Sequence, residues 1–179
     1  MRFIPTPIAG AYVVELELIE DERGFFARSY CREEFLAHGL DLNLPQCNIS
    51  YNKTKGTLRG MHYQALPYAE AKLVRCTQGA IYDVIVDLRP ESATFKHWHS
   101  VELTAMQRNA LYIPEGLAHG FQTLEDNSEV FYQMCQSYHR ESVKGVRWDD
   151  PAFAITWPLS QPIISERDCS YALWEDHKC

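Results

Sequence analysis

The sequence predicts an all-β protein, a barrel or sandwich of many short strands with a few short helices at its periphery. Three observations support this prediction. Strand-like runs follow one another closely, turn signals separate them regularly, and aromatic residues are frequent, with 10 Tyr, 8 Phe and 4 Trp in 179 residues. This length suffices for one domain with a sizeable core. No linker, repeat or low-complexity segment divides the chain, so we expect a single domain over residues 1–179.

Alternating or apolar runs predict the strands, and clusters of Gly, Pro, Asp and Asn predict the turns between them. The expected strands and extended segments are 13–19, 25–30, 45–51, 57–64, 71–77, 80–88, 97–103, 110–113, 120–124 and 129–137. A short helix is expected over residues 32–38, ending at Gly39. Residues 148–179 are punctuated by Pro and Trp and are expected to wrap the barrel as short helices and loops.

Charge and composition exclude several classes of protein. The formal net charge is −7, and the absence of a basic field argues against binding to nucleic acid. No run of about 18 apolar residues is present, and the N-terminus lacks an apolar signal segment, so no membrane span is expected. The six cysteines form no C-x-x-C pair, which favours reduced thiols and a cytoplasmic location.

The segment 57–64, TLRGMHYQ, contains the first candidate for catalysis, His62. A histidine titrates near neutrality and can accept a proton at working pH, although a lone strand histidine is more often structural. Arg59 and Lys72 accompany it, and two nearby cations favour its neutral form. Strict alternation places Arg59 and His62 on opposite faces of the strand. Gly60 can host a β-bulge that returns both to one face, and regular pairing throughout 58–64 would contradict this hypothesis.

A second pattern, P-x-G-x-x-H, is matched by residues 114–119 and ends at His119. This pattern is typical of the cupin barrel, whose earlier metal-binding motif is G-x5-H-x-H-x3-4-E-x6-G. Here HYQ replaces H-x-H at residues 62–64, and Lys72 stands where the motif carries its glutamate. A lysine repels a cation, so we expect no metal. His97 and His99 share the H-x-H spacing, but we expect them on a surface strand edge beside Lys96.

Three further side chains are candidates with open roles. Tyr132 shares a strand face with Val130 and Met134 and is expected to point inward, where both a core role and a polar role are possible. A carboxylate bonded to the far nitrogen of His62 would fix its tautomer. Asp168 and Asp83 are both candidates for that partner, and Asp168 also suits a helix cap or a turn.

Together with further motifs, these residues resemble the dTDP-4-dehydrorhamnose 3,5-epimerases, a cupin-like family that acts on nucleotide-linked 4-keto-6-deoxy sugars. The resemblance covers nearly the whole chain. The motifs that carry it are DERGFF at 21–26, QCNIS at 46–50, LRGMHYQ at 58–64, KLV at 72–74, DVIVDLR at 83–89, IPEGLAHGF at 113–121, Tyr132, WDDP at 148–151, WP at 157–158 and SERD at 165–168.

The resemblance implies a cupin-like jelly-roll barrel and an isomerase that needs neither cofactor nor metal. It implies that His62 is the base, Asp168 its partner, Tyr132 the opposing acid and Lys72 the cation beside the enolate oxygen. The implied substrate-binding residues are Arg23, Phe26, Arg28, Gln46, Asn48, Arg59, His119, Tyr138 and Arg167. Of these, Phe26 or Tyr138 would stack on the nucleobase of the substrate. The family also implies a homodimer in which residues 23–28 reach the partner's site.

The residue types agree with this chemistry. Removing a proton beside a ketone needs a base on one face, a donor on the other and positive charge at the oxygen. The most specific expectation is the conversion of dTDP-4-dehydro-6-deoxy-D-glucose to dTDP-4-dehydro-L-rhamnose. The alternatives are a C3-only epimerase acting on a GDP-, CDP- or UDP-linked sugar, a cupin 3,4-ketoisomerase, a metal-dependent oxygenase and a noncatalytic barrel. Arg28, Cys47 and Lys144 depart from the family pattern and leave the nucleotide and the sugar open.

Overall fold

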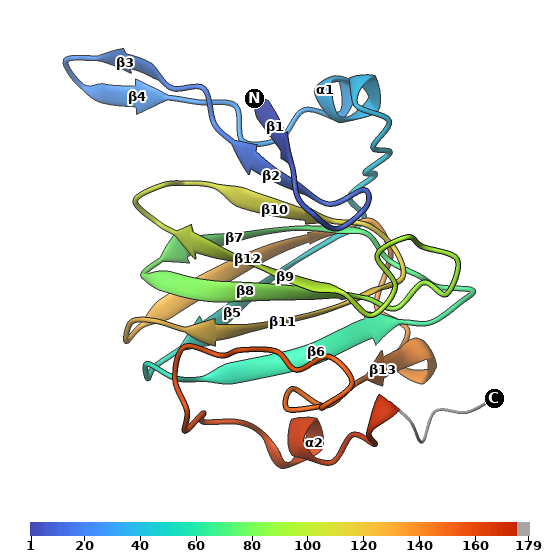
Figure 1. Cartoon of the computed structure of the whole chain (residues 1–179). Coiled ribbons are helices and arrows are strands. Elements are labelled where there is room, and N and C mark those ends of the chain that lie inside the picture. Colours follow the sequence, from blue (N-terminus) through green and yellow to red (C-terminus); the bar gives the residue numbers. More distant parts are fainter. Residues whose placement is uncertain (175–179) are drawn as a thin grey trace.

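The computed structural model describes residues 1–174, and over this range it consists mainly of two packed antiparallel sheets (Figure 1). The first sheet has the order β1 (Arg2–Pro5), β2 (Tyr12–Glu15), β10 (Ala110–Ile113), β7 (Lys72–Gln78), β12 (Ser128–Met134), β5 (Gln46–Asn52). The second has the order β13 (Val143–Gly145), β6 (Leu58–Gln64), β11 (Leu117–Thr123), β8 (Ala80–Asp87), β9 (Trp98–Thr104). This arrangement confirms the predicted all-β, cupin-like fold.

The remaining elements are short. A hairpin of β3 (Ile19–Asp21) and β4 (Gly24–Phe26) stands away from the sheets, at the upper left of Figure 1. The helices are α1 (Arg32–Ala37) and α2 (Glu166–Cys169), and a 3-10 turn, η1, spans Arg140–Ser142. Within residues 1–174, no helix combines the length and the apolar character that crossing a membrane requires.

Strand alternation divides the apolar side chains into three layers. The inner faces of the two sheets share a core that includes Val74, Ile85 and Val130. The outer face of the six-stranded sheet is covered by the α1 region, where Phe35 is fully buried. The outer face of the five-stranded sheet is covered by the C-terminal segment through Phe153 and its neighbours. The C-terminal segment therefore wraps the barrel as predicted, although residues 175–179 lie outside the described range.

Several expected boundaries were wrong. The strand expected over 13–19 is divided between β2 and β3, because the chain leaves the six-stranded sheet after β2 and forms the projecting hairpin of β3 and β4. The strand expected over 25–30 ends at Phe26, where the pairing of that hairpin ends. β11 begins three residues earlier than expected because residues 117–119 pair with β8. The edge strands β1 and β13 were not predicted, since they have only four and three residues. β1 pairs with the equally short β2, and β13 pairs with the longer β6.

The predicted β-bulge at Gly60 is confirmed. His119 pairs with His62 whereas Phe121 pairs with Arg59, so β6 carries one extra residue opposite β11. A Cβ atom on Gly60 would lie 2.6 Å from the Cα of Gly120, so this close approach requires glycine. The extra residue turns Arg59 and His62 toward the same cavity.

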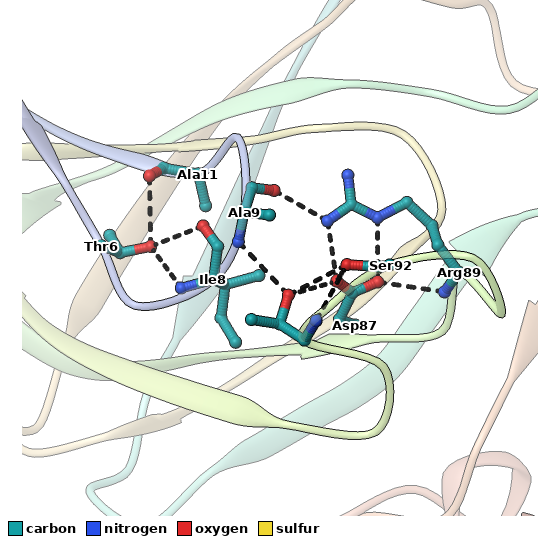
Figure 2. Close-up of polar contacts among 8 residues, drawn as sticks. Thr6, Ile8, Ala9, Ala11, Asp87, Arg89 and Ser92 are labelled. Atoms are coloured by element: carbon teal, nitrogen blue, oxygen red, sulfur yellow. Dashed lines mark hydrogen bonds and ion pairs between the residues drawn. The ribbon is translucent and has the colours of Figure 1, made fainter.

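A buried polar network fixes the end of β8 (Figure 2). The Asp87 carboxylate accepts hydrogen bonds from the Arg89 side chain, from Ser92 Oγ at 2.6 Å and from Thr94 Oγ1 at 2.7 Å. Arg89 also donates to the carbonyl of Ala9 in the loop between β1 and β2. Burial opposes ionisation of Asp87, but these donors outweigh it and hold its pKa well below the usual range. The network therefore anchors the strand that carries Asp83.

Candidate active site

One cavity of about 430 Å³ lies between the two sheets. Both sheets and the C-terminal segment contribute polar side chains to it, and the apolar core fills the space beside it. Ten of the predicted site residues line it: Gln46 and Asn48 of β5, Arg59 and His62 of β6, Lys72 of β7, His119 of β11, Tyr132 of β12, Tyr138, and Arg167 and Asp168 of α2.

His62 is paired with Asp168 through a 2.7 Å contact between Nε2 and Oδ1. A carboxylate only accepts, so Nε2 carries the proton and Nδ1 is left as the basic nitrogen. The His62 side chain is 37% exposed and that of Asp168 only 7%, so the pair presents its imidazole to the cavity. The structure thus selects Asp168 over Asp83 as the partner of His62.

Local structure places Asp168 beside His62. Ser165 caps α2 by accepting the backbone N–H of Asp168, and Gly60 N–H donates to Asp168 Oδ2 at 3.1 Å. Burial opposes ionisation of this carboxyl group. The hydrogen bond and charge of His62, the Gly60 N–H and the charge of Arg167 outweigh burial and lower its pKa. Asp168 is therefore an anion at neutral pH and can stabilise an imidazolium.

A second histidine–carboxylate pair lies on the same wall of the cavity, the one formed by the five-stranded sheet. His119 Nε2 is 2.9 Å and 3.1 Å from the two carboxylate oxygens of Asp83, and both side chains are buried. Burial raises the pKa of Asp83, against the opposing effects of His119 and Lys72. The sequence signal for this pair was a carboxylate in the middle of a mostly apolar strand, because such a group needs a polar partner.

Tyr132 faces this wall from the opposite sheet. Its strand places it on the inner face beside the apolar core, as predicted, and its ring meets the His119 ring edge-on at 6.2 Å. Burial, together with the negative charge of Asp83, raises the pKa of Tyr132 despite the nearby Arg59. The hydroxyl therefore stays protonated at neutral pH, which is the form that can donate a proton to a substrate.

Lys72 supplies a buried cation on the same sheet as Tyr132. Its ammonium lies 2.9 Å from Glu70 Oε1, and both side chains line the cavity. Glu70 was not identified from the sequence, where it is one acidic residue in the segment between two strands. Among residues 1–174 no group of three metal-ligating side chains is found, and the expectation that no metal takes part stays a prediction.

The expected ligand-binding residues fall into two sets. Arg59, Gln46, Asn48, His119, Tyr138 and Arg167 line the cavity. Arg59 is held by a 2.7 Å hydrogen bond from Nε to Asn52 Oδ1. Arg23, Phe26 and Arg28 lie on or next to the projecting hairpin and do not line the cavity of their own chain. The two arginines pair instead with Asp21 and Glu34.

The arrangement suits proton transfer to and from carbon. An imidazole bonded to a carboxylate stands on one sheet, and a protonated tyrosine and an ammonium group stand on the other. A flat anion between the sheets would meet a base on one face and a donor on the opposite face, with positive charge at its edge. Two arginines add charge suited to phosphate groups.

Comparison with known proteins gives a consistent result. Residues 5–176 match the family model described as dTDP-4-dehydrorhamnose 3,5-epimerase. A relative of that name from Shigella flexneri is 42% identical over 169 residues, covering 94% of this chain and 93% of the relative.

Solved structures agree with the sequence comparison. A dTDP-4-dehydrorhamnose 3,5-epimerase from Elizabethkingia anophelis NUHP1 superposes with a TM-score of 0.96 at 36% identity, covering 99% and 98% of the two chains. A dTDP-6-deoxy-D-glucose-3,5-epimerase from Legionella pneumophila Philadelphia 1, in complex with dTDP-4-keto-L-rhamnose, superposes with a TM-score of 0.92 at 35% identity, covering 99% and 94%.

Proposed function

The chain belongs to the dTDP-4-dehydrorhamnose 3,5-epimerase family, and on this premise we propose that it converts dTDP-4-dehydro-6-deoxy-D-glucose to dTDP-4-dehydro-L-rhamnose. The reaction inverts C3 and C5, which both flank the C4 ketone. One observation carries the proposal: His62 and Tyr132 line the same cavity but belong to different sheets, so they face each other across it.

In the first step, His62 Nδ1 takes the proton from the carbon beside the ketone. The electron pair of the broken C–H bond moves to the C4 oxygen and forms an enolate. The Lys72 ammonium stabilises that oxygen, and Asp168 stabilises the imidazolium that has formed. Because Asp168 is already ionised, no rearrangement of charge in the pair has to precede the step.

In the second step, the Tyr132 hydroxyl gives its proton to the opposite face of the same carbon. The enolate electrons return to form the new C–H bond, and the centre is inverted. Arg59 and Arg167 are suited to hold the diphosphate, with Gln46, Asn48 and His119 near the sugar. Tyr138, which lines the cavity and is 57% exposed, is placed to stack on the base of the nucleotide.

The proposed reaction is tested by isotope exchange. In deuterated water, dTDP-4-keto-6-deoxyglucose should gain deuterium at C3 and at C5, as followed by NMR and mass spectrometry. Exchange at C3 alone would identify a C3-only epimerase, and a 3-keto product would identify a ketoisomerase. The same assay with GDP-, UDP- and CDP-linked 4-keto sugars tests the choice of nucleotide. Absence of exchange with every 4-keto sugar would refute the epimerase proposal.

We also propose a homodimer in which residues 23–28 complete the partner's site. Ile19 and Phe26 on the hairpin are 69% and 72% exposed, and Ile49 on the edge strand β5 is 63% exposed. Such exposed apolar residues suit contact with another chain.

The location proposed is the cytoplasm, in keeping with the cysteines at 31, 47, 76, 135 and 169, which are all unpaired.

Subunit mixing tests the shared site. The two variants His62→Ala and Arg23→Ala should each be weakly active when purified alone. After unfolding and refolding together, about a quarter of all sites should be intact, because half of the dimers are mixed and each of these has one complete site. The control is a mixture of His62→Ala with Asp168→Asn. Both residues line the cavity of the same chain, so every site in a mixed dimer keeps one of the two changes, and no activity should be recovered. A monomeric mass in solution, or no recovery in the first mixture, would contradict the shared site.

A further inference from the structure

We propose that Gln64 is a positioning residue that holds the loop carrying Tyr138 in the place where its ring meets the nucleotide. The proposal rests on the proposed function for the identity of the ligand. It assigns a role to the last residue of the segment TLRGMHYQ, whose side chain also lines the cavity. Nothing in the chemistry of the two proton transfers requires this glutamine.

The contacts of Gln64 all lead to main-chain atoms of two loops. Its Oε1 accepts the backbone N–H of His139 at 2.7 Å. Its Nε2 donates to the carbonyl of Ser137 at 3.2 Å and to the carbonyl of Tyr68 at 3.1 Å. The residues on both sides of Tyr138 are therefore held by one side chain, which is only 3% exposed.

A second glutamine holds the residue between them. The backbone N–H of Tyr138 donates to Gln46 Oε1 at 3.0 Å, so the three consecutive residues 137–139 are each bonded to a glutamine side chain. The two glutamines come from β5 and β6, the strands on either side of the cavity. The rings of Tyr68 and His139 also stack, with centroids 3.5 Å apart and an interplanar angle of 12°.

This geometry distinguishes positioning from direct binding. Both N–H groups of Gln64 Nε2 donate to loop carbonyls and Oε1 already accepts the His139 N–H, so the side chain has no donor left for a ligand. A surface loop that is held in its bound arrangement loses less conformational freedom when the ligand arrives. Gln64 should therefore act on affinity for the nucleotide, through Tyr138, and leave the proton transfers nearly unchanged.

The test replaces Gln64 with methionine, which keeps the length of the side chain and removes its hydrogen bonds. If the correctly placed loop falls to about a tenth of the population, the apparent Kd for dTDP and the KM for the 4-keto sugar should each rise about tenfold, with kcat changed less than about twofold. Gln64→Glu is a second variant, because it keeps the acceptor for His139 and places an oxygen against the two carbonyls. Calorimetric titration with dTDP alone measures the Kd.

A matched control is available in Gln122 of β11. This side chain is also fully buried and also bridges a loop, donating to the carbonyl of Leu159 and accepting its N–H, both at 3.0 Å. It does not line the cavity. Gln122→Met should lower the melting temperature and leave the Kd for dTDP unchanged. A Kd raised equally by both variants would show that general loosening is the cause, and it would overturn the proposal.

A double-mutant cycle tests the route of the effect. In a Tyr138→Ala background, Gln64→Met should raise the KM by less than about twofold, because the ring it positions is gone. A full tenfold rise in that background, or a fall in kcat at constant KM, would overturn the proposal. The proposed function is judged separately, by isotope exchange in the unaltered protein, whereas the dTDP titration judges Gln64 whatever sugar the protein accepts.

Discussion

His62→Ala is expected to slow deuterium exchange into dTDP-4-keto-6-deoxyglucose by about 10²- to 10⁴-fold, because this is the contribution of a positioned general base to a rate. Methyl in place of imidazole removes the histidine that presents its ring to the cavity, whereas the neighbouring His119 and its partner Asp83 are both buried. Exchange at C3 and at C5 should fall together if one base serves both carbons. The measurement is the initial rate of deuterium incorporation by NMR.

Asp168→Asn tests the same pair from its other side. An amide can accept the Nε2 proton through its oxygen, but it no longer supplies the negative charge that stabilises the imidazolium, so we expect a loss of about 10²-fold or more. His99→Ala is the control for both variants, because His99 lies on the edge strand β9 outside the cavity.

If His62→Ala keeps the original exchange rate while its fold is intact by circular dichroism, the assignment of His62 as the base is refuted.

Tyr132→Phe is expected to separate exchange from inversion. His62 can remove a proton, exchange it with solvent and return deuterium to the same face, so part of the exchange should persist. Inverted product should fall by about 10²-fold or more, because the opposite face has lost its positioned donor. Running the variant in deuterated water and analysing recovered substrate and product by NMR gives both rates from one sample.

The control for this variant is Tyr112→Phe. Tyr112 is also a buried tyrosine, and burial raises its pKa to about 12, but it belongs to the outer core beneath α1. Its loss should leave both rates unchanged. If Tyr132→Phe forms inverted product as fast as the unaltered protein, Tyr132 is not the acid, and another donor on the six-stranded sheet has to be sought.

Much of the site was predictable because chemistry and periodicity are local properties. The segment 57–64 contains a titratable group, a cation and a glycine able to host a bulge within eight residues. The alternation of 130, 132 and 134 placed Tyr132 on the inner face, and the structure confirms that placement. The strands that were missed or misplaced are those whose order comes from a neighbour, such as β13 beside β6.

Pairing across the chain was not predictable in this way. Asp168 lies 106 positions from His62 and Asp83 lies 36 positions from His119, and from the sequence both carboxylates suited His62. Glu70 beside Lys72 and Gln64 beneath residues 137–139 gave no sequence signal of their roles. Each of these contacts depends on which loops and strands the fold brings together.

The sequence alone determined the strand pattern, the family motifs and the chemical types available at the site, because these follow from residue order and from intrinsic properties of side chains. Only the tertiary structure decided which carboxylate orients His62 and which neutralises Lys72. It also decided that Arg59 and His62 share a face, and that the segment 23–28 lies away from the cavity of its own chain. The physical reason is that hydrogen bonds and ion pairs act over a few ångströms in space, and distance along the chain does not set which groups come that close.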